Sequence, residues 1–151
     1  MSQHVLVTGG TGYIGGATVR LLLQNNFHVT VLDDLSRGHR SSVPPVARLL
    51  VGNIANAALL NHLFAESPIA AVMHFAAFAG VGESMQNPAL YFRNNTAATL
   101  TLLEAPTEAA EMTLERPART ETICARMKGR VTGTRGSTII GRAVACFVSY
   151  R

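Results

Sequence analysis

The stretch VTGGTGYIGGATVRLLLQ, residues 7–24, gives the strongest indication of architecture in this chain. Its glycines satisfy two spacings at once, Gly-x-Gly-x-x-Gly from Gly10 and Gly-x-x-Gly-x-x-Gly from Gly9. A short apolar run precedes them and an amphipathic run follows, so the glycines stand between a predicted strand and a predicted helix. In that setting the free N–H groups of the first helical turn hold a phosphate group. We therefore interpret the stretch as a dinucleotide-binding turn.

Three glycines and an acidic pair have expected roles in this interpretation. Gly9 allows the tight turn, Gly12 lets a pyrophosphate approach the backbone, and Gly15 lets the helix pack close to the strand. Asp33 follows Gly15 by 18 residues, with Asp34 beside it. A carboxylate there accepts hydrogen bonds from the ribose hydroxyls of an adenosine and repels a 2′-phosphate, which predicts NAD rather than NADP as the cofactor.

Strand and helix patterns alternate along the first two thirds of the chain. Strands are expected at residues 4–8, 28–32, 48–51 and 70–75, and helices at residues 13–25, 56–66 and 88–105. This order predicts the α/β class, with a Rossmann-like doubly wound parallel sheet and helices on both faces. Glu83 and Ser84 are expected in a Gly-rich loop after the fourth strand, where they either cap the loop or contact substrate.

The composition changes near residue 105. Residues 1–105 hold five basic and five acidic residues, whereas residues 106–151 hold eight basic and four acidic ones, so the whole net charge of +4 lies in the second part. Apart from a weak strand pattern at residues 143–148, that part has no sustained period. We expect a truncated NAD(P)-binding domain over residues 1–105 with an incomplete sheet. The atypical basic tail over residues 106–151 is expected to be poorly ordered or out of frame.

The same composition argues against several classes of protein. No apolar run reaches the roughly 18–20 residues that span a membrane, and the N-terminus has no signal-peptide pattern, so we expect a cytoplasmic chain with no membrane partner. The basic tail lacks interleaved aromatic residues, which argues against nucleic acid as a partner. The histidines have no metal-ligand spacing, so no metal site is expected.

Four stretches together resemble the extended short-chain dehydrogenase/reductase family. They are VLVTGGTGYIGG, VLDDLSRGHRSSVP, HFAAFAGVGESMQNPALYFRNN and TAATLTLLEA, and the resemblance covers residues 3–105. The third stretch is the most specific and resembles the UDP-glucose 4-epimerases of that family. The resemblance implies NAD as cofactor, a UDP-sugar as substrate in a complete enzyme, a role in galactose and nucleotide-sugar metabolism, and a homodimer.

The resemblance also implies which residues bind the cofactor. The implied residues are Gly9, Gly12, Tyr13, Ile14, Gly15, Asp33, Asp34, Leu35, Ser36, Arg37, Gly38, Asn53, Ile54, Phe75, Ala76, Ala77, Phe78, Ala79 and Asn95. Two of them depart from the family pattern. Asn53 stands where the family usually has an Asp that accepts a hydrogen bond from the adenine amino group, and Ala79 stands where some relatives have Lys. Arg37 could soften the preference for NAD by pairing with a phosphate.

The catalytic unit of the family is not found in this chain. That unit is a Tyr with a Lys four residues later, in which the Lys lowers the pKa of the Tyr that takes the sugar proton. None of the three tyrosines has a Lys four residues later, and the only lysine is Lys128. We therefore expect no catalytic residue and no activity for the chain alone. Two alternatives stay open: a fragment of a nucleotide-sugar dehydratase or decarboxylase, and a non-catalytic NAD-binding module.

Two expectations concern the core. His74 ends an apolar strand and is expected to be a hydrogen-bonded core histidine rather than a catalyst. Because the tail does not read as the missing strands of the sheet, some apolar side chains are expected to lack partners. They are Val72, Phe75, Leu100 and Leu103.

Overall fold

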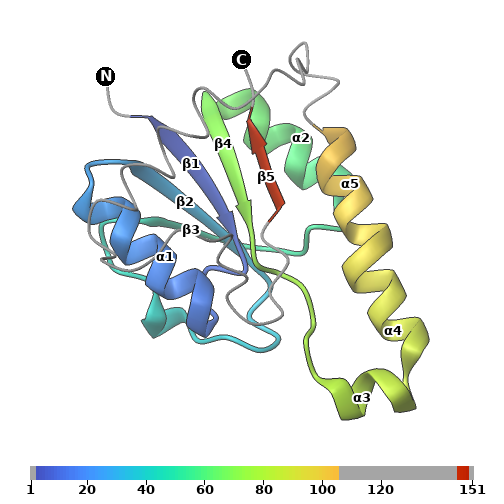
Figure 1. Cartoon of the computed structure of the whole chain (residues 1–151). Helices are drawn as coiled ribbons and strands as arrows, with labels where there is room; N and C mark the ends of the chain where they lie inside the picture. Colours follow the sequence, from blue (N-terminus) through green and yellow to red (C-terminus); the bar gives the residue numbers. More distant parts are fainter. Residues whose placement is uncertain (1–2, 106–145, 150–151) are drawn as a thin grey trace, which may run out of the picture.

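The computed structural model describes residues 3–105 and 146–149, which form one sheet with helices on both faces (Figure 1). Four parallel strands, β1 (His4–Thr8), β2 (His28–Asp33), β3 (Arg48–Val51) and β4 (Ile69–His74), agree with the predicted Rossmann-like sheet. A fifth strand, β5 (Cys146–Ser149), pairs antiparallel with β4. The strand order is β3-β2-β1-β4-β5. The weak strand pattern at residues 143–148 is confirmed for residues 146–148, and residues 106–145 and 150–151 lie outside the described residues.

Two helices match the predicted ones closely, and a third begins and ends where expected but is not uniform. They are α1 (Tyr13–Gln24) and α2 (Ala57–Glu66). The predicted helix at residues 88–105 comprises α4 (Pro88–Phe92), a π-helical segment η2 (Arg93–Ala97) and α5 (Ala98–Glu104), which follow one another without a break. A 3₁₀ turn, η1 (Arg40–Ser42), lies between β2 and β3.

The prediction of a loop around Glu83 and Ser84 is wrong, because these residues lie in the short helix α3 (Val81–Gln86). The two glycines just before them, Gly80 and Gly82, suggested a loop, but Gly80 is the N-cap residue of this helix. Its carbonyl oxygen accepts the Ser84 N–H at 3.0 Å, and the Glu83 carbonyl oxygen accepts the Asn87 N–H at 2.8 Å.

The end of α1 shows why the chain turns where the sequence predicts. Asn26 has φ of 61°, the left-handed conformation that Asn tolerates better than most residues. Its N–H donates to the Leu23 carbonyl at 3.1 Å, and the Phe27 N–H donates to the Leu22 carbonyl at 3.1 Å. This pair of bonds is a Schellman motif, which leads the chain directly into β2.

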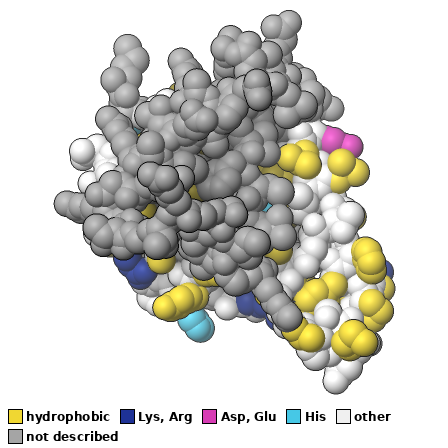
Figure 2. All heavy atoms as spheres, in the orientation of Figure 1, with side chains coloured by type: hydrophobic (Ala, Val, Ile, Leu, Met, Phe, Trp, Pro, Cys, Tyr) yellow, Lys and Arg dark blue, Asp and Glu magenta, His cyan; other side chains and the backbone are white. Residues whose placement is uncertain are grey.

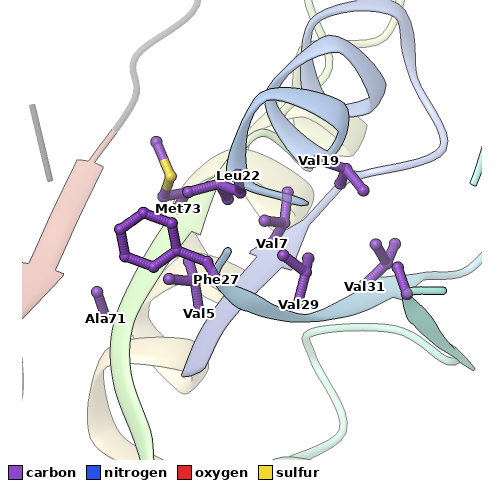
Figure 3. Packing of buried hydrophobic residues seen from close by; sticks show 10 residues of the cluster. Val5, Val7, Val19, Leu22, Phe27, Val29, Val31, Ala71 and Met73 are labelled. Atoms are coloured by element: carbon purple, nitrogen blue, oxygen red, sulfur yellow. The ribbon is translucent and has the colours of Figure 1, made fainter. Parts of the chain in front are cut away.

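The sheet separates two apolar clusters, because successive strand residues point to opposite faces. On one face, Val5 and Val7 of β1 pack against Val19 and Leu22 of α1, with Phe27 and Met73 completing the contact (Figure 3). On the other face, Leu6 lies in a cluster with residues of α2 and α5. β1 is therefore covered on both faces, which fixes the position of the glycine turn that follows it.

The expectation that four apolar side chains lack packing partners is confirmed only in part. Val72 is 1% exposed and lies in the cluster that α2 and α5 cover, so the expectation is wrong for this residue. Phe75 is half-buried and packs against the cluster under α1. Leu103 is also half-buried, whereas Leu100 is 54% exposed, as expected for a side chain without a core to enter.

His74 joins β4 to β1 and α5, as a hydrogen-bonded core histidine should. The side chain is 5% exposed. Its Nδ1 lies 2.6 Å from Thr8 Oγ1 and its Nε2 lies 3.1 Å from Thr99 Oγ1. A neutral imidazole donates a hydrogen bond to one of these hydroxyls and accepts one from the other. Burial lowers the pKa of His74, so the neutral form is the one that the fold stabilises.

This burial makes stability depend on pH. The pKa of His74 is lowered from 6.5 in the fold, so its contribution is complete above pH 6.5 and is lost as pH falls towards the folded value. His4, whose pKa is lowered by burial and by the charges of His28 and Arg48, acts in the same direction. We expect His74→Gln to cost about 1–3 kcal/mol at neutral pH, because Thr8 or Thr99 loses a partner.

The variant should also lose less stability on acidification than the parent chain. Urea unfolding between about pH 8 and pH 5 measures both effects. A variant that keeps the full acid-side slope of the parent would show that His74 does not carry this linkage.

Candidate functional site

An open pocket lies beyond the carboxyl ends of the parallel strands. Its wall is built from the segments that follow β1, β2, β3 and β4, where the strand order reverses around β1. This is the position at which open α/β sheets bind their ligands. The residues that line it are Gly9, Gly12, Leu32, Asp33, Asp34, Ser36, Arg37, Gly38, Gly52, Asn53, Ile54, Phe75, Ala76, Ala77, Phe78 and Asn94.

Most of the residues implied by the family resemblance come together in this wall. Thirteen of the nineteen line the pocket. The six that do not are Tyr13, Ile14, Gly15, Leu35, Ala79 and Asn95. The sequence interpretation missed Leu32, Gly52 and Asn94, of which Asn94 had the best signal because it stands beside Asn95.

The three glycines of the turn differ in what surrounds them. Gly9 has φ of 71°, and a Cβ there would lie 2.5 Å from the Phe75 carbonyl carbon. A Cβ on Gly15 would lie 2.9 Å from Gly10 Cα and even closer to the Gly9 carbonyl oxygen. These distances agree with the predicted tight turn and close helix packing. A Cβ on Gly12 would meet only the Gly9 carbonyl oxygen, at 3.4 Å, so the space above Gly12 is open.

The beginning of α1 also suits an anion. Asn56 and Asn87 cap α2 and α4 with their side-chain oxygens, whereas the N-cap residue of α1, Gly12, has no side chain to accept the N–H groups of the first turn. Those N–H groups and the helix dipole favour negative charge next to the start of α1. Tyr13, at the start of the helix, is 95% exposed and leaves this end open.

Asp33 connects the glycine turn to the loop after β2. Its Oδ2 accepts the backbone N–H of Thr11 at 3.0 Å, and its Oδ1 accepts the N–H of Leu35 at 2.9 Å. Leu35 has φ of 62°, which a leucine adopts only where the surroundings impose it. Each carboxylate oxygen keeps a further lone pair, so Asp33 orders the wall and can still accept hydrogen bonds from a ligand.

Asp34 forms a second connection, to the segment after β3. Its Oδ1 accepts the Ser36 N–H at 2.9 Å and its Oδ2 accepts an amide hydrogen of Asn53 at 2.8 Å. Burial opposes the charge on Asp34, but the bonds from Ser36 and Asn53 outweigh burial and lower its pKa. The Asn53 Oδ1 accepts the Ala55 N–H at 2.8 Å. The amide side chain thus bridges a carboxylate and a backbone N–H.

Two asparagines of η2 hold the segment after β4. Asn95 accepts the Phe78 N–H at 2.8 Å and donates to the Phe78 carbonyl at 2.9 Å. Asn94 donates to the Ala76 carbonyl at 2.9 Å. Asn95 therefore acts behind the wall, whereas Asn94 is part of it. π-Helical segments such as η2 occur frequently at functional sites.

Four side chains, Arg37, Phe78, Glu83 and Tyr91, form a cluster, and two of them, Arg37 and Phe78, line the pocket. Arg37 Nη2 donates to both carboxylate oxygens of Glu83, at 2.8 and 2.6 Å, and the guanidinium carbon lies 4.0 Å from the centre of the Phe78 ring. The Tyr91 hydroxyl donates to Glu83 at 2.7 Å. The Tyr91 and Phe78 rings meet edge to face with centroids 5.7 Å apart. The cluster joins the loop after β2 to α3 and α4.

Among residues 3–105 and 146–149, no group of three His, Cys, Asp or Glu side chains is placed to hold a metal ion. In that described part, no helix is long and apolar enough to cross a membrane.

Comparison with known proteins gives consistent results. A sequence profile described as "NAD dependent epimerase/dehydratase family" matches residues 5–116. The chain is 48% identical over 101 residues to a UDP-glucose 4-epimerase of Lacticaseibacillus casei. The aligned segment covers 67% of this chain and 30% of that protein. It is 45% identical over 111 residues to a probable UDP-arabinose 4-epimerase of Oryza sativa subsp. japonica, covering 68% and 27% respectively.

Solved structures agree with these relatives. The crystal structure of a UDP-glucose 4-epimerase from Brucella ovis in complex with NAD matches with a TM-score of 0.66 at 42% identity, covering 69% of this chain and 32% of that one. A Thermus thermophilus UDP-glucose 4-epimerase in complex with NAD matches with a TM-score of 0.66 at 38% identity, covering 68% and 33%. The chain therefore spans about a third of the length of these proteins.

The surroundings of the glycines predict which of them the fold needs. Gly15→Ala should lower the free energy of unfolding by about 1–3 kcal/mol, because its Cβ overlaps backbone that has no room to move. Gly12→Ala should change it by no more than about 1 kcal/mol, since φ of −77° is allowed for alanine and the nearest atom is at contact distance. Urea unfolding of both variants compares them directly. Equal losses would contradict the assignment of Gly12 to an open space.

Proposed function

Since this chain belongs to the NAD dependent epimerase/dehydratase family, we propose that its pocket binds NAD and that it is the amino-terminal, cofactor-binding part of a UDP-sugar 4-epimerase. The observation that carries this proposal is the pocket itself, which brings an open glycine turn and the Asp33 carboxylate together at the carboxyl ends of the strands. The chain covers 30% of the first relative, so the activity of a complete enzyme is part of the proposal.

The proposed binding mode follows from the wall of the pocket. The open space above Gly12 and the uncapped start of α1 suit the pyrophosphate. Asp33 is the acceptor for the adenosine ribose, and Asn53 lies where an adenine would contact the segment after β3. The segment held by Asn94 and Asn95 would support the nicotinamide half. Bound there, NAD would supply hydride transfer, which no side chain provides.

We propose UDP-glucose and UDP-galactose as the sugars that a complete enzyme interconverts, in galactose and nucleotide-sugar metabolism. The relatives named UDP-glucose 4-epimerase support this choice. The relatives named UDP-arabinose 4-epimerase support the second candidate, a UDP-pentose epimerase. A cytoplasmic location is proposed on the same resemblance.

We also propose that the face formed by α3, α4 and α5 pairs with a second copy of the chain. Four large apolar side chains on these helices are exposed: Val81 57%, Met85 80%, Phe92 71% and Leu100 54%. Yellow side chains gather on this part of the molecule in Figure 2. The family resemblance implies a homodimer, and this apolar surface suits one.

The dimer is tested by placing a charge on that face. Phe92→Asp should shift the chain towards monomer, because a carboxylate opposite its symmetry copy is both desolvated and repelled. Sedimentation equilibrium over a range of concentrations measures the change. A parent chain that stays monomeric at every concentration would refute the dimer.

NAD binding is tested with a variant that spares the fold. Gly12→Val should keep the α/β circular dichroism of the parent chain and lose NAD binding by at least tenfold, because its methyl groups fill the space proposed for the pyrophosphate. Isothermal calorimetry with the full chain measures both affinities. Equal NAD affinity for parent and variant would remove the glycine turn from the site.

The chain alone should not interconvert UDP-glucose and UDP-galactose. It lacks a Tyr followed four residues later by Lys, and the loss of a general base alone costs about 10²–10⁴-fold in rate. A coupled assay that detects UDP-glucose formation is the measurement. Turnover in the ordinary enzyme range of about 1–10³ per second would show that another residue serves as the base.

A further inference from the structure

We propose that Glu83 is a specificity-determining residue, which keeps the pocket selective for NAD over NADP by holding the Arg37 guanidinium away from a 2′-phosphate. The inference rests on the proposed function, because it requires that the pocket bind the adenosine ribose of a dinucleotide. It assigns a role to a residue that does not line the pocket and that lies on a helix the sequence did not predict.

Arg37 is placed where a 2′-phosphate would find a partner. Among the residues that line the pocket, it is the only one with a positive charge. It stands four residues after Asp33, on the loop where related dinucleotide folds carry either an acid for the ribose hydroxyls or an arginine for the 2′-phosphate. This loop carries both an acid, Asp33, and an arginine, Arg37. The bonds that Arg37 makes therefore decide whether it is available to a 2′-phosphate.

In the structure the guanidinium is already engaged. Its Nη2 donates to both carboxylate oxygens of Glu83, and its central carbon lies 4.0 Å from the centre of the Phe78 ring. Glu83 is held in turn by the Tyr91 hydroxyl, at 2.7 Å. The guanidinium is therefore hydrogen-bonded to a residue of α3 and in cation–π contact with a residue of the segment after β4.

The charges around the site also disfavour a 2′-phosphate. Hydrogen bonds from Tyr91 and Arg37 lower the pKa of Glu83, so its carboxylate is ionised at neutral pH. A 2′-phosphate would then face the carboxylates of Asp33, Asp34 and Glu83 with one guanidinium to offset them. Removing the Glu83 charge both releases Arg37 and removes one repulsion.

The size of the effect is limited by exposure. The side chains of Arg37 and Glu83 are 47% and 42% exposed, and exposed ion pairs are weak because water competes for both partners. We therefore expect Glu83→Gln to raise NADP affinity relative to NAD by roughly three- to tenfold.

The experiment compares four chains by calorimetry with NAD and NADP, and with 5′-AMP and adenosine 2′,5′-bisphosphate as probes without nicotinamide. They are the parent, Glu83→Gln, Glu83→Gln with Arg37→Met, and Glu66→Gln. The last is the matched control, because Glu66 pairs with Arg48 at 3.4 Å, their side chains are 42% and 52% exposed respectively, and Glu66 lies outside the pocket wall.

Support requires that Glu83→Gln alone gain affinity for NADP and for the 2′-phosphorylated probe, that the gain vanish in the double variant, and that Glu66→Gln show none. A gain that persists without Arg37, or that Glu66→Gln shares, means that net charge rather than Arg37 sets the selectivity and overturns the inference. No gain in Glu83→Gln overturns it too. A parent chain that fails to bind NAD overturns the proposed function itself, which separates the two failures.

Discussion

Three segments of backbone meet at Gly9 with no room for a side chain, and the remainder of the site depends on that contact. A Cβ on Gly9 would strike the backbone of Phe75, at the exit of β4, and a Cβ on Gly15 would strike the carbonyl of Gly9 itself. The turn after β1, the first turn of α1 and the segment after β4 therefore approach as closely as peptide groups allow. This approach places the start of α1 over the pocket and brings the loops after β1 and β4 into one wall.

The sequence predicts what local pattern determines. The strands around Val5, Val29 and Val72 follow from apolar, β-branched runs, and the glycine turn follows from spacing between a strand and a helix. The bond between Arg37 and Glu83 joins residues 46 positions apart, so no window of sequence contains it. Asn94 was missed as a pocket residue because its position depends on a π-helical turn that no periodicity predicts. The expectation that Val72 lacks packing partners was wrong because residues of α5 pack in the same cluster.

The asparagine at position 53, where the family usually has an aspartate, has a structural role of its own in this chain. Asn53 donates to Asp34 and accepts from Ala55, so its two ends serve groups of opposite character. A carboxylate in its place could not donate to Asp34, and two like charges would face each other at hydrogen-bond distance. In this chain the Asn53 amide stabilises the ionised Asp34 without a cation. A neutral side chain at position 53 therefore favours the negative charge at position 34.

The central position of β1 has a consequence for how the chain is made. β1 is synthesised before β4, yet the two strands are neighbours in the sheet, and Thr8 and His74 are separated by 66 residues. At synthesis rates of about 5–20 residues per second, β1 waits several seconds with one edge unpaired after it emerges. Open apolar edges recruit other strands during such intervals. The edge of β1 that β4 covers in the sheet is therefore open to pairing with other strands until β4 emerges.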